Sequence, residues 1–271
     1  MYISIDVGAT NIGIAGSDSL KKPKLDFFAK IDIQDDYSKD LENITGEFKH
    51  ISNLQGVTLG VPGILNEAKT QARTLNLKSW FGKNLKEDFE SRLGCKVILE
   101  NDAALAALGE GMYGNGKNKD FIFMIWGTGV GGTRIQHESG SIKYFPLEPG
   151  HDIIIKEGGR EGSCGHRGDL ESYTGGASVK KYYGKTADKL SDEEWDEVVS
   201  YFAKGIGMIL ETYPLDLIVF GGGVATRQPD KIERIQKEVQ REFPSVGLTI
   251  SALGENAALY GGFGLLALQE N

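Results

Sequence analysis

Two glycine-rich segments combine residue types that can bind phosphate groups. The first, DVGATN, covers residues 6–11, and the second, GTGVGG, covers residues 127–132. Glycine lets the backbone approach a ligand closely, and successive N–H groups in a bend form an anion-binding concavity. Thr10 adds a hydroxyl to the first segment, and Asp6 can hold Mg²⁺ through water. Together these residues have the chemistry to bind the phosphates of a nucleotide and their cation.

Each glycine-rich segment also has a purely structural explanation. Gly8 suits a hairpin bend with positive φ, and residues 127–132 suit a turn or a bulge. Because both segments follow comparable apolar runs, a two-sided phosphate clamp explains the pair better than two unrelated turns do. A third glycine run, at residues 221–223, has the freedom to lie against an adenosine, and a sharp strand-to-helix turn explains it nearly as well.

Asn101 and Asp102 stand between the apolar run VILE and an alanine-rich segment that is typical of a helix. The structural interpretation, which the pair alone favours, is that one of them is the N-cap of that helix. The functional interpretation is that Asp102 accepts the proton of a sugar hydroxyl while Asn101 holds the sugar by hydrogen bonds. A weak base suffices, because the proton leaves late in a loose phosphoryl-transfer transition state.

A second group of polar residues lies further along the chain, in the segments EPGH and GDLE. Glu148, His151 and Glu171 offer carboxylates and an imidazole, which suit a polyhydroxyl ligand because each sugar hydroxyl both donates and accepts. Each can also be an ordinary surface residue. The residues alone therefore indicate a nucleotide-binding α/β protein with a polar insertion, and they leave the second substrate open.

Short apolar runs predict the strands that position these residues. Runs at residues 2–5 and 12–16 predict a hairpin around the first glycine-rich bend, and residues 25–33 predict a third strand. Residues 37–52 have the length and spacing of a crossover helix, and residues 57–63 read as a buried strand that ends in glycine. The segment as a whole is one α/β unit.

A similar order returns in the second half of the chain. Residues 121–136 predict a strand, a glycine-rich bend and another strand, and residues 216–224 predict a further strand that runs into glycine. We interpret this as a weak internal repeat whose second copy is interrupted by an insertion at residues 140–184. Two such units facing each other form a cleft.

Helix signals complete the pattern. Residues 102–109 contain four alanines, Ser191 and Glu194 form a capping-box pattern ahead of a long amphipathic run, and residues 256–268 are apolar and helical in character. The predicted fold class is therefore α/β.

Bulk composition excludes several classes of protein. The 271 residues are enough for two lobes, and the net charge of −8 argues against a nucleic-acid surface. The first residues lack the pattern of a signal peptide, and no window predicts a membrane span. Cys95 and Cys164 are too few for a disulfide framework. We expect a soluble cytoplasmic protein with no nucleic-acid or membrane partner.

The ordered motifs resemble the ROK sugar kinases and repressors of the actin-like ATPase superfamily. The resemblance covers essentially the whole chain and is carried by DVGATNIGIAG, VTLGVPG, NLKSW, ENDAALAALGE, WGTGVGG, EPGH, CGHRGDLESYTGG, LIVFGGGV and the glycine-rich C-terminal helix. It implies duplicated actin-like ATPase (ribonuclease H-like) lobes with a cleft between them. It also implies glucokinase-like phosphorylation of a hexose or hexose derivative by ATP with Mg²⁺, usually at the 6-hydroxyl.

The resemblance also assigns roles to individual residues. Asp102 resembles the catalytic base of the family, and Asp6 the residue that binds Mg²⁺ through water. The residues that resemble the family's sugar ligands are Gly63, Asn101, Asp102, Glu148, His151 and Glu171. The residues that resemble its nucleotide ligands are Asp6, Gly8, Thr10, Asn11, Thr128, Gly129 and Gly222. We expect one lobe at residues 1–118 with 256–271, closed by the C-terminal helix, and a larger lobe at residues 119–255 that carries the sugar-site insertion.

One motif departs from the family pattern. The family's zinc motif, C-x-C-G-x-x-G-C-x-E, aligns with residues 162–171, where two of its three cysteines are replaced. His151, which resembles the fourth zinc ligand, is present. A substitute set of His151, Cys164 and Asp169, with His166, is chemically conceivable, but two lost thiolates remove most of the affinity of a structural site. We expect no structural zinc, and whether these four residues retain any metal stays open.

Two other functions compete with a kinase. A ROK-type repressor needs a helix-turn-helix segment ahead of the first strand, which begins here at Tyr2, and it suits an acidic chain poorly. A catalytically impaired sugar-binding or regulatory protein has no need of Asp102 and both phosphate segments. Glucose, fructose, mannose, allose and N-acetylated hexosamines all remain candidate substrates. The oligomeric state stays open, with a homodimer possible because relatives commonly form one.

Overall fold

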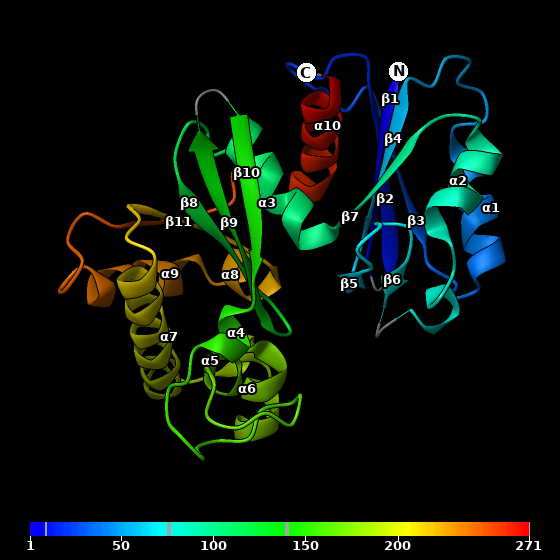
Figure 1. Cartoon of the computed structure of the whole chain (residues 1–271). Helices are drawn as coiled ribbons and strands as arrows, with labels where there is room; N and C mark the ends of the chain where they lie inside the picture. The colour runs from blue at the N-terminus through cyan, green and yellow to red at the C-terminus, as the bar shows by residue number, and fades with distance from the viewer. Residues whose placement is uncertain (9, 75–76, 139–140, 271) are drawn as a thin grey trace. The chain divides into compact units, whose positions relative to one another are not determined.

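The computed structural model describes residues 1–8, 10–74, 77–138 and 141–270. Ala9 of the first glycine-rich bend, Asn76 of NLKSW and Gly140, where we placed the start of the insertion, lie outside the described residues. The chain divides into two compact units, one formed by Met1–Tyr113 with Asn256–Asn271 and the other by Gly114–Glu255. Each unit contains a five-stranded open sheet flanked by helices, which confirms the predicted α/β class (Figure 1).

The sheet of the first unit has the order β3-β2-β1-β4-β7. Its strands are β1 (Tyr2–Val7), β2 (Asn11–Ser17), β3 (Phe27–Asp32), β4 (Gly56–Val61) and β7 (Val97–Asn101). β1, β2 and β3 are antiparallel neighbours, whereas β1, β4 and β7 run parallel. The small hairpin of β5 (Ile64–Leu65) and β6 (Ala72–Arg73) follows β4, and the turn η1 (Lys78–Trp80) comes after it.

Helices cover both faces of this sheet. α1 (Tyr37–Glu47) and α2 (Leu85–Leu93) pack over the face that carries Ile3, Ile5 and Leu59. α3 (Asp102–Tyr113) packs along α10 (Ala257–Glu270), which lies on β1 and β4 of the opposite face. The close approach of α10 depends on glycine, since a Cβ on Gly262 would overlap the hydroxyl of Ser4.

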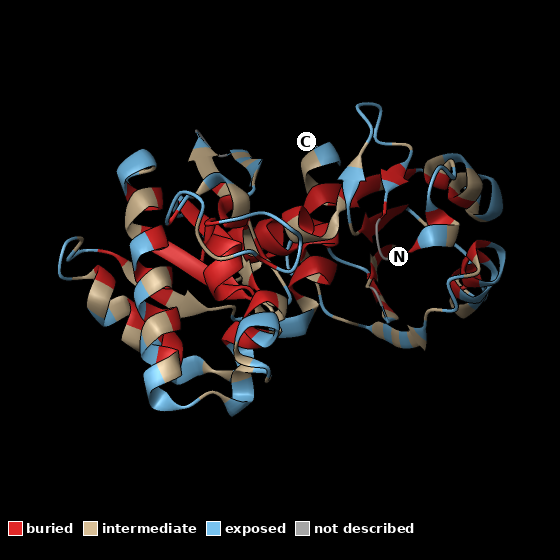
Figure 2. Cartoon of the chain, turned by 90° about the horizontal axis from the view of Figure 1, so that it is seen from below, coloured by how far each residue is buried: buried red, intermediate tan, exposed pale blue. Residues whose placement is uncertain are grey.

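The second unit repeats this plan with the order β10-β9-β8-β11-β12. Its strands are β8 (Phe121–Trp126), β9 (Val130–Glu138), β10 (Ser141–Leu147), β11 (Leu217–Gly221) and β12 (Gly247–Ile250). Its helices and short turns are α4 (Pro149–Asp152), α5 (Leu170–Thr174), α6 (Gly176–Tyr183), η2 (Ala187–Lys189), α7 (Asp192–Thr212), α8 (Gly223–Arg227), α9 (Pro229–Val239) and η3 (Gly254–Asn256). In both units the buried residues follow the strands and the helix faces that cover them (Figure 2).

The two sheets confirm the internal repeat and correct the position of the insertion. Both have two antiparallel pairings followed by two parallel ones, so β10 is the counterpart of β3. The sequence analysis counted β10 as part of an insertion at residues 140–184. This was wrong, because SIKYFPL alternates exposed and half-buried residues at the sheet edge and lacks a buried apolar run. The additional segment begins after Leu147.

Most predicted elements lie where expected, with shifts at their ends. The capping box of Ser191 and Glu194 is present at the start of α7. The helix predicted over residues 37–52 ends at Glu47, because Phe48 leaves the helical conformation and buries its ring in the core. No helix among the residues that the structure describes is long and apolar enough to cross a bilayer.

Candidate functional site

The first glycine-rich bend joins β1 to β2 as an antiparallel hairpin. Gly8 N donates to Asn11 O over 3.0 Å, and a Cβ on Gly8 would lie 2.9 Å from that oxygen. Gly8 therefore closes the hairpin turn, but the positive φ that was predicted for it is wrong: Gly8 is not among the glycines with positive φ, and the close approach of Asn11 O is what requires a glycine there. Thr10 is exposed, and its Oγ1 accepts a 3.2 Å hydrogen bond from Asn11 Nδ2. The bend thus presents the Thr10 hydroxyl on its surface.

Asp6 and Asp102 share one electrostatic environment in the first unit. Burial, with a smaller contribution from the nearby carboxylate of Asp102, raises the pKa of Asp6 to about 7. Burial also raises the pKa of Asp102, although the Ala103 N–H, which donates to Asp102 Oδ1 over 2.9 Å, opposes the shift. The two carboxyl groups at the ends of β1 and β7 are therefore stronger bases than exposed aspartates.

Asn101 caps α3 and holds the loop that contains Gly63. Its Oδ1 accepts from Ala104 N over 3.0 Å, and its Nδ2 donates to Gly63 O over 3.0 Å. Gly63 has a φ of +99°, and a Cβ there would overlap the carbonyl oxygen of Arg73. The N-cap of α3 is thus Asn101, and the same side chain also binds the carbonyl group of Gly63.

Glu100 supports this arrangement from inside β7. Only 4% of its surface is exposed, its Oε1 accepts from Asn101 N over 3.0 Å, and its Oε2 pairs with Lys69 Nζ. Glu100 is a site residue that was not predicted from the sequence. The signal was a single carboxylate within the apolar run VILE, which requires a partner when it is buried.

The second glycine-rich bend lies between β8 and β9 and is held by α5 and α6. Gly176 N and Ala177 N donate to the carbonyl oxygens of Gly127 and Thr128, each over 2.9 Å. From α5, Glu171 Oε2 accepts a 2.9 Å hydrogen bond from Val130 N. A Cβ on Gly129 would overlap this carboxylate, so Gly129 is required for the contact.

The structure brings together Glu148, His151 and Glu171 in the second unit. His151 Nε2 lies 4.0 Å from Glu171 Oε1, and burial raises the pKa of the Glu148 carboxyl. The pKa of His151 is also raised, because its contacts with Asp169, Glu171 and Glu148 outweigh the lowering effect of its burial. The first unit groups Gly63, Asn101 and Asp102, so the predicted sugar ligands form one group in each unit.

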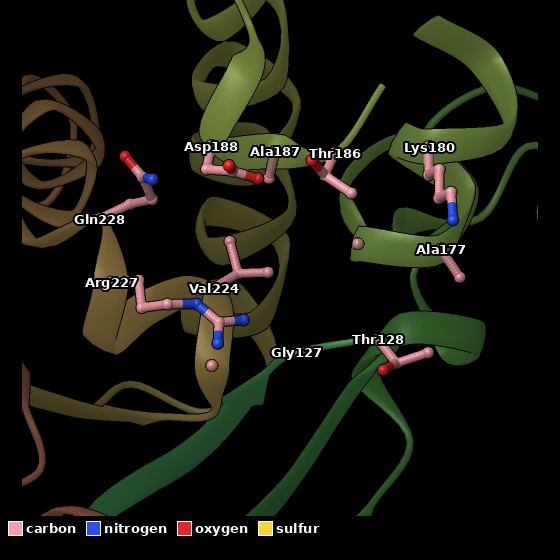
Figure 3. Close-up of a pocket in the computed structure, with 12 residues that line it drawn as sticks. Gly127, Thr128, Ala177, Lys180, Thr186, Ala187, Asp188, Val224, Arg227 and Gln228 are labelled. Atoms are coloured by element: carbon pink, nitrogen blue, oxygen red, sulfur yellow. The ribbon is translucent and has the colours of Figure 1, made fainter. Parts of the chain in front are cut away.

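A cavity of about 660 Å³ opens beside the second bend (Figure 3). This volume is in the usual range for small-molecule sites. Lys180 of α6 and Arg227 of α8 extend around the same opening as Thr128. The complete lining is Gly127, Thr128, Gly176, Ala177, Lys180, Thr186, Ala187, Asp188, Gly223, Val224, Arg227 and Gln228. Sequence reasoning missed the two cations, because single basic residues on helices are usually solvated.

Gly222 does not line this cavity but makes the turn that shapes it. It is the N-cap of α8 with a φ of +89°, and a Cβ there would lie 2.6 Å from the carbonyl oxygen of Trp126. Its Gly223 neighbour lines the opening. Gly222 therefore makes the strand-to-helix turn, and its contact with an adenosine stays a prediction.

We expect Gly222→Ala to lower the free energy of unfolding well beyond the ~1–2 kcal/mol cost of a left-handed residue. The reason is that the added Cβ collides with the Trp126 backbone in addition to adopting a disfavoured φ. Gly184→Ala is the matched control, since Gly184 has a φ of +72° with open space around its Cβ position. Urea denaturation of both variants checks this, and equal losses would contradict it.

A third group of side chains, next to His151, has the composition of a metal site. Ligand atoms of His151, Cys164, His166 and Asp169 all lie within 4.8 Å of one another. Sequence reasoning named these residues as a conceivable set and expected no zinc. The structure places their ligand atoms close together.

Comparison with known proteins gives one family for the whole chain. The ROK family model matches residues 2–269. The glucokinase of Halalkalibacterium halodurans is 27% identical, over 100% of this chain and 96% of the relative. The xylose repressor of Bacillus subtilis is also 27% identical, over 77% of this chain and 60% of the repressor. A solved ROK family glucokinase from Streptomyces griseus, in complex with glucose and AMPPNP, has the same fold, with a TM-score of 0.75 at 21% identity and coverage of 97% and 98%.

Proposed function

The chain belongs to the ROK family, and from this premise we propose that it transfers the γ-phosphoryl group of ATP to a hydroxyl of a hexose or hexose derivative. Similarity to glucokinases supports a sugar phosphotransferase, although the family also contains repressors. The single observation that carries the proposal is the environment of Asp102. A half-buried carboxylate with a raised pKa begins α3, directly after a side chain that is fixed to Gly63.

In the proposed reaction Asp102 orients the acceptor hydroxyl, most simply the 6-hydroxyl of the sugar. The hydroxyl oxygen forms a bond to the γ-phosphorus, and the bond from that phosphorus to the β–γ bridging oxygen breaks, so ADP leaves. The hydroxyl proton passes to Asp102 as the new bond forms. A raised pKa makes the Asp102 carboxylate a better acceptor of this proton than an exposed aspartate.

The nucleotide is proposed to bind through backbone groups and a few charges. The bend with Thr128 and Gly129 supplies N–H donors to the phosphates, while the neighbouring cavity accommodates the nucleoside. In the other unit, the Gly8, Thr10 and Asn11 bend supplies a second set of donors. Asp6 would hold Mg²⁺ through water, and the cation would supply neutralisation of the phosphate charge.

The sugar is proposed to bind through groups that the structure already orients. Asn101 retains hydrogen-bonding capacity beyond its contacts to Ala104 and Gly63. In the second unit, Glu171 uses Oε2 to hold the glycine-rich bend, while its Oε1 faces His151. One carboxylate therefore connects the proposed sugar ligands to the proposed phosphate loop.

The test is ADP production over a panel of sugars that includes glucose, fructose, mannose, allose and N-acetylated hexosamines. We expect ADP release that depends on both Mg²⁺ and one or a few of these sugars. Isothermal titration with the same panel separates the rival function. Sugar binding without turnover of any sugar would support an impaired sugar-binding or regulatory protein instead.

We also expect Arg227→Ala to raise the KM for ATP by roughly tenfold or more, with little change in the KM for the sugar. The guanidinium lines the cavity beside the bend, and a charge-assisted hydrogen bond contributes about 1.5–3 kcal/mol. Arg241→Ala, at an exposed residue after α9, is the matched control. Initial rates at varied ATP check this, and an unchanged KM would remove Arg227 from the nucleotide site.

A further inference from the structure

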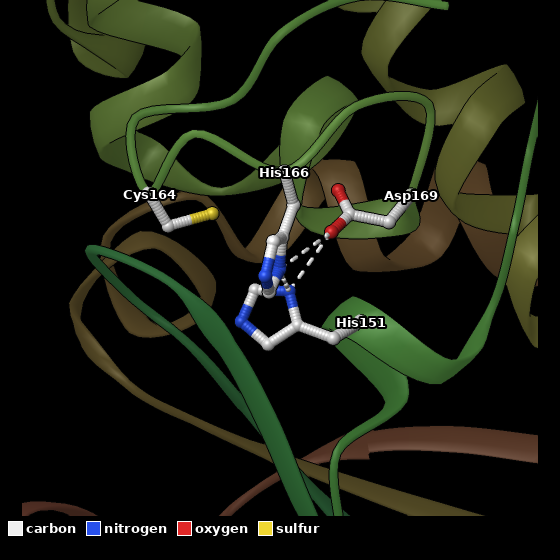
Figure 4. Close-up of side chains that lie close together, drawn as sticks. All are labelled: His151, Cys164, His166 and Asp169. Atoms are coloured by element: carbon white, nitrogen blue, oxygen red, sulfur yellow. Dashed lines mark hydrogen bonds and ion pairs between the residues drawn. The ribbon is translucent and has the colours of Figure 1, made fainter. Parts of the chain in front are cut away.

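The segment between β10 and α7 brings three hard or borderline donor atoms into one triangle (Figure 4). His151 Nδ1 lies 2.8 Å from Asp169 Oδ2, and His166 Nδ1 lies 3.1 Å from His151 Nδ1 and 3.6 Å from Asp169 Oδ2. Cys164 points its sulfur toward the same group, within 4.8 Å of the other donors. Four potential ligands from two separate turns of the chain thus converge.

These distances suit a shared cation better than a hydrogen-bonded cluster. His151 Nδ1 is either a donor or an acceptor in a given tautomer, so its contacts to Asp169 and to His166 Nδ1 cannot both be ordinary hydrogen bonds. Ligands at ~2.0–2.1 Å around a tetrahedral metal are about 3.3 Å apart. The three observed separations bracket that value, and one cation satisfies all three atoms together.

The carboxylate is oriented as a metal ligand requires. Asp169 is 2% exposed and caps α5, and its Oδ1 accepts from both the backbone N–H and the hydroxyl of Ser172. Its Oδ2 is left facing the two imidazoles. Such fixing of the second oxygen by neighbouring donors is typical of ligands in metal centres.

The loop that carries Cys164 and His166 is held in place by contacts of its own. Arg160 pairs with Glu197 over 2.9 Å and lies over the ring of Tyr182 at 3.3 Å. Lys181 Nζ donates to Gly162 O over 2.9 Å. These contacts anchor the loop to α6 and α7, so interactions other than metal ligation also hold the donor atoms in place.

The first cysteine position of the family motif has no room for a cysteine side chain in this chain unless its neighbours move. Gly162 stands there, and a Cβ would lie 2.8 Å from Ser172 Oγ and 3.2 Å from Ser178 Oγ. His166, which no position of the motif matches, instead directs its imidazole at the cluster. The set of ligands is therefore specific to this chain.

We infer that His151, Cys164, His166 and Asp169 form a site for one exchangeable first-row divalent cation such as Zn²⁺ or Co²⁺. This reverses the expectation from sequence that the lost thiolates leave no zinc. Two imidazoles, one thiolate and one carboxylate favour borderline transition metals over Mg²⁺ or Ca²⁺. With one thiolate in place of three, the site binds metal more weakly than the family motif and releases it to chelators.

The test is a titration of the untagged, metal-stripped protein with Co²⁺, followed by absorption. We expect one equivalent to produce the visible bands of tetrahedral cobalt and the near-ultraviolet band of a cobalt–thiolate bond, both displaced by Zn²⁺. Cys164→Ser is expected to remove the thiolate band, and His166→Ala to weaken Co²⁺ binding at least tenfold. His166 is 61% exposed on its side chain, so its removal leaves the fold intact.

Matched controls separate the site from the other cysteine and from an exposed histidine. Cys95→Ser and His50→Ala should titrate like the unmodified chain, because both residues lie in the other unit. Absence of saturable binding, or a thiolate band that survives Cys164→Ser, would overturn the inference. This readout is independent of kinase activity, so failure here leaves the proposed function untouched.

Discussion

Asp102→Asn is expected to lower kcat by roughly 10²- to 10⁴-fold, the range that general bases contribute, while the Kd for the sugar changes little. The amide keeps the size of the carboxylate, and its oxygen can still accept from the Ala103 N–H at the start of α3. It cannot accept the hydroxyl proton. The variant therefore loses the chemical step and keeps the binding geometry.

A coupled ADP assay and isothermal titration with the preferred sugar measure the two quantities separately. Asp18→Asn is the matched control, since its side chain is 74% exposed in the same unit. The control is expected to retain full turnover. Near-normal kcat in Asp102→Asn would remove Asp102 from the role of base.

Asp6→Asn is expected to stop Mg²⁺-dependent turnover and yet to raise the free energy of unfolding at neutral and alkaline pH. Asp6 has a pKa of about 7 in the folded chain, against 3.8 for an ordinary aspartate, so the folded state favours the protonated form. Its ionisation destabilises the fold progressively as the pH rises from about 4 to 7, and the full effect is present above pH 7. At 1.36 kcal/mol for each pKa unit, removing the charge contributes up to about 4 kcal/mol, an upper limit because Asp6 is partly exposed.

Urea denaturation in the presence of a chelator checks this second prediction. The stabilisation by Asp6→Asn should be largest at pH 8 and should shrink as the pH falls toward 5. Asp18→Asn again serves as control and should show no such trend. If Asp6→Asn raised the free energy of unfolding equally at every pH, or lowered it at pH 8, the ionisation of Asp6 would not destabilise the fold.

The sequence predicted the framework of both units because it depends on local patterns. Buried apolar runs that end in glycine located β1 and β8, and Ser191 with Glu194 located the start of α7. β10 was missed because an edge strand with one exposed face has no continuous apolar run. The only signal for β10 was an alternation of polar and apolar residues, which a polar loop also shows by chance.

The sequence nominates residues for the candidate site but does not predict the contacts that they make. Glu171 was expected as a sugar ligand, and its hydrogen bond to Val130 N joins positions 41 residues apart. Gly222 was expected near adenosine, which stays a prediction, and the structure adds that its φ and its close approach to the Trp126 backbone make it a turn residue. Such pairings depend on how helices pack against the sheet, which no local pattern contains.

The grouping around His151 shows the same limit more sharply. Four residues spread over an irregular segment converge, and contacts such as those of Arg160 and Lys181 anchor their loop to α6 and α7. From the motif alone, the replacement of two cysteines led us to expect no structural zinc. The structure shows that His166 and Asp169 lie beside His151 and Cys164, so the cluster has four potential metal ligands.

Mass balance of one turnover mixture tests the central claim most directly. The protein, ATP, Mg²⁺ and the preferred sugar are incubated together, and the products are identified by phosphorus NMR and mass spectrometry. We predict one equivalent of ADP and one of a hexose phosphate with the phosphate on the 6-oxygen. ADP with free phosphate and no sugar phosphate, for every hexose tried, would contradict the assignment as a sugar kinase.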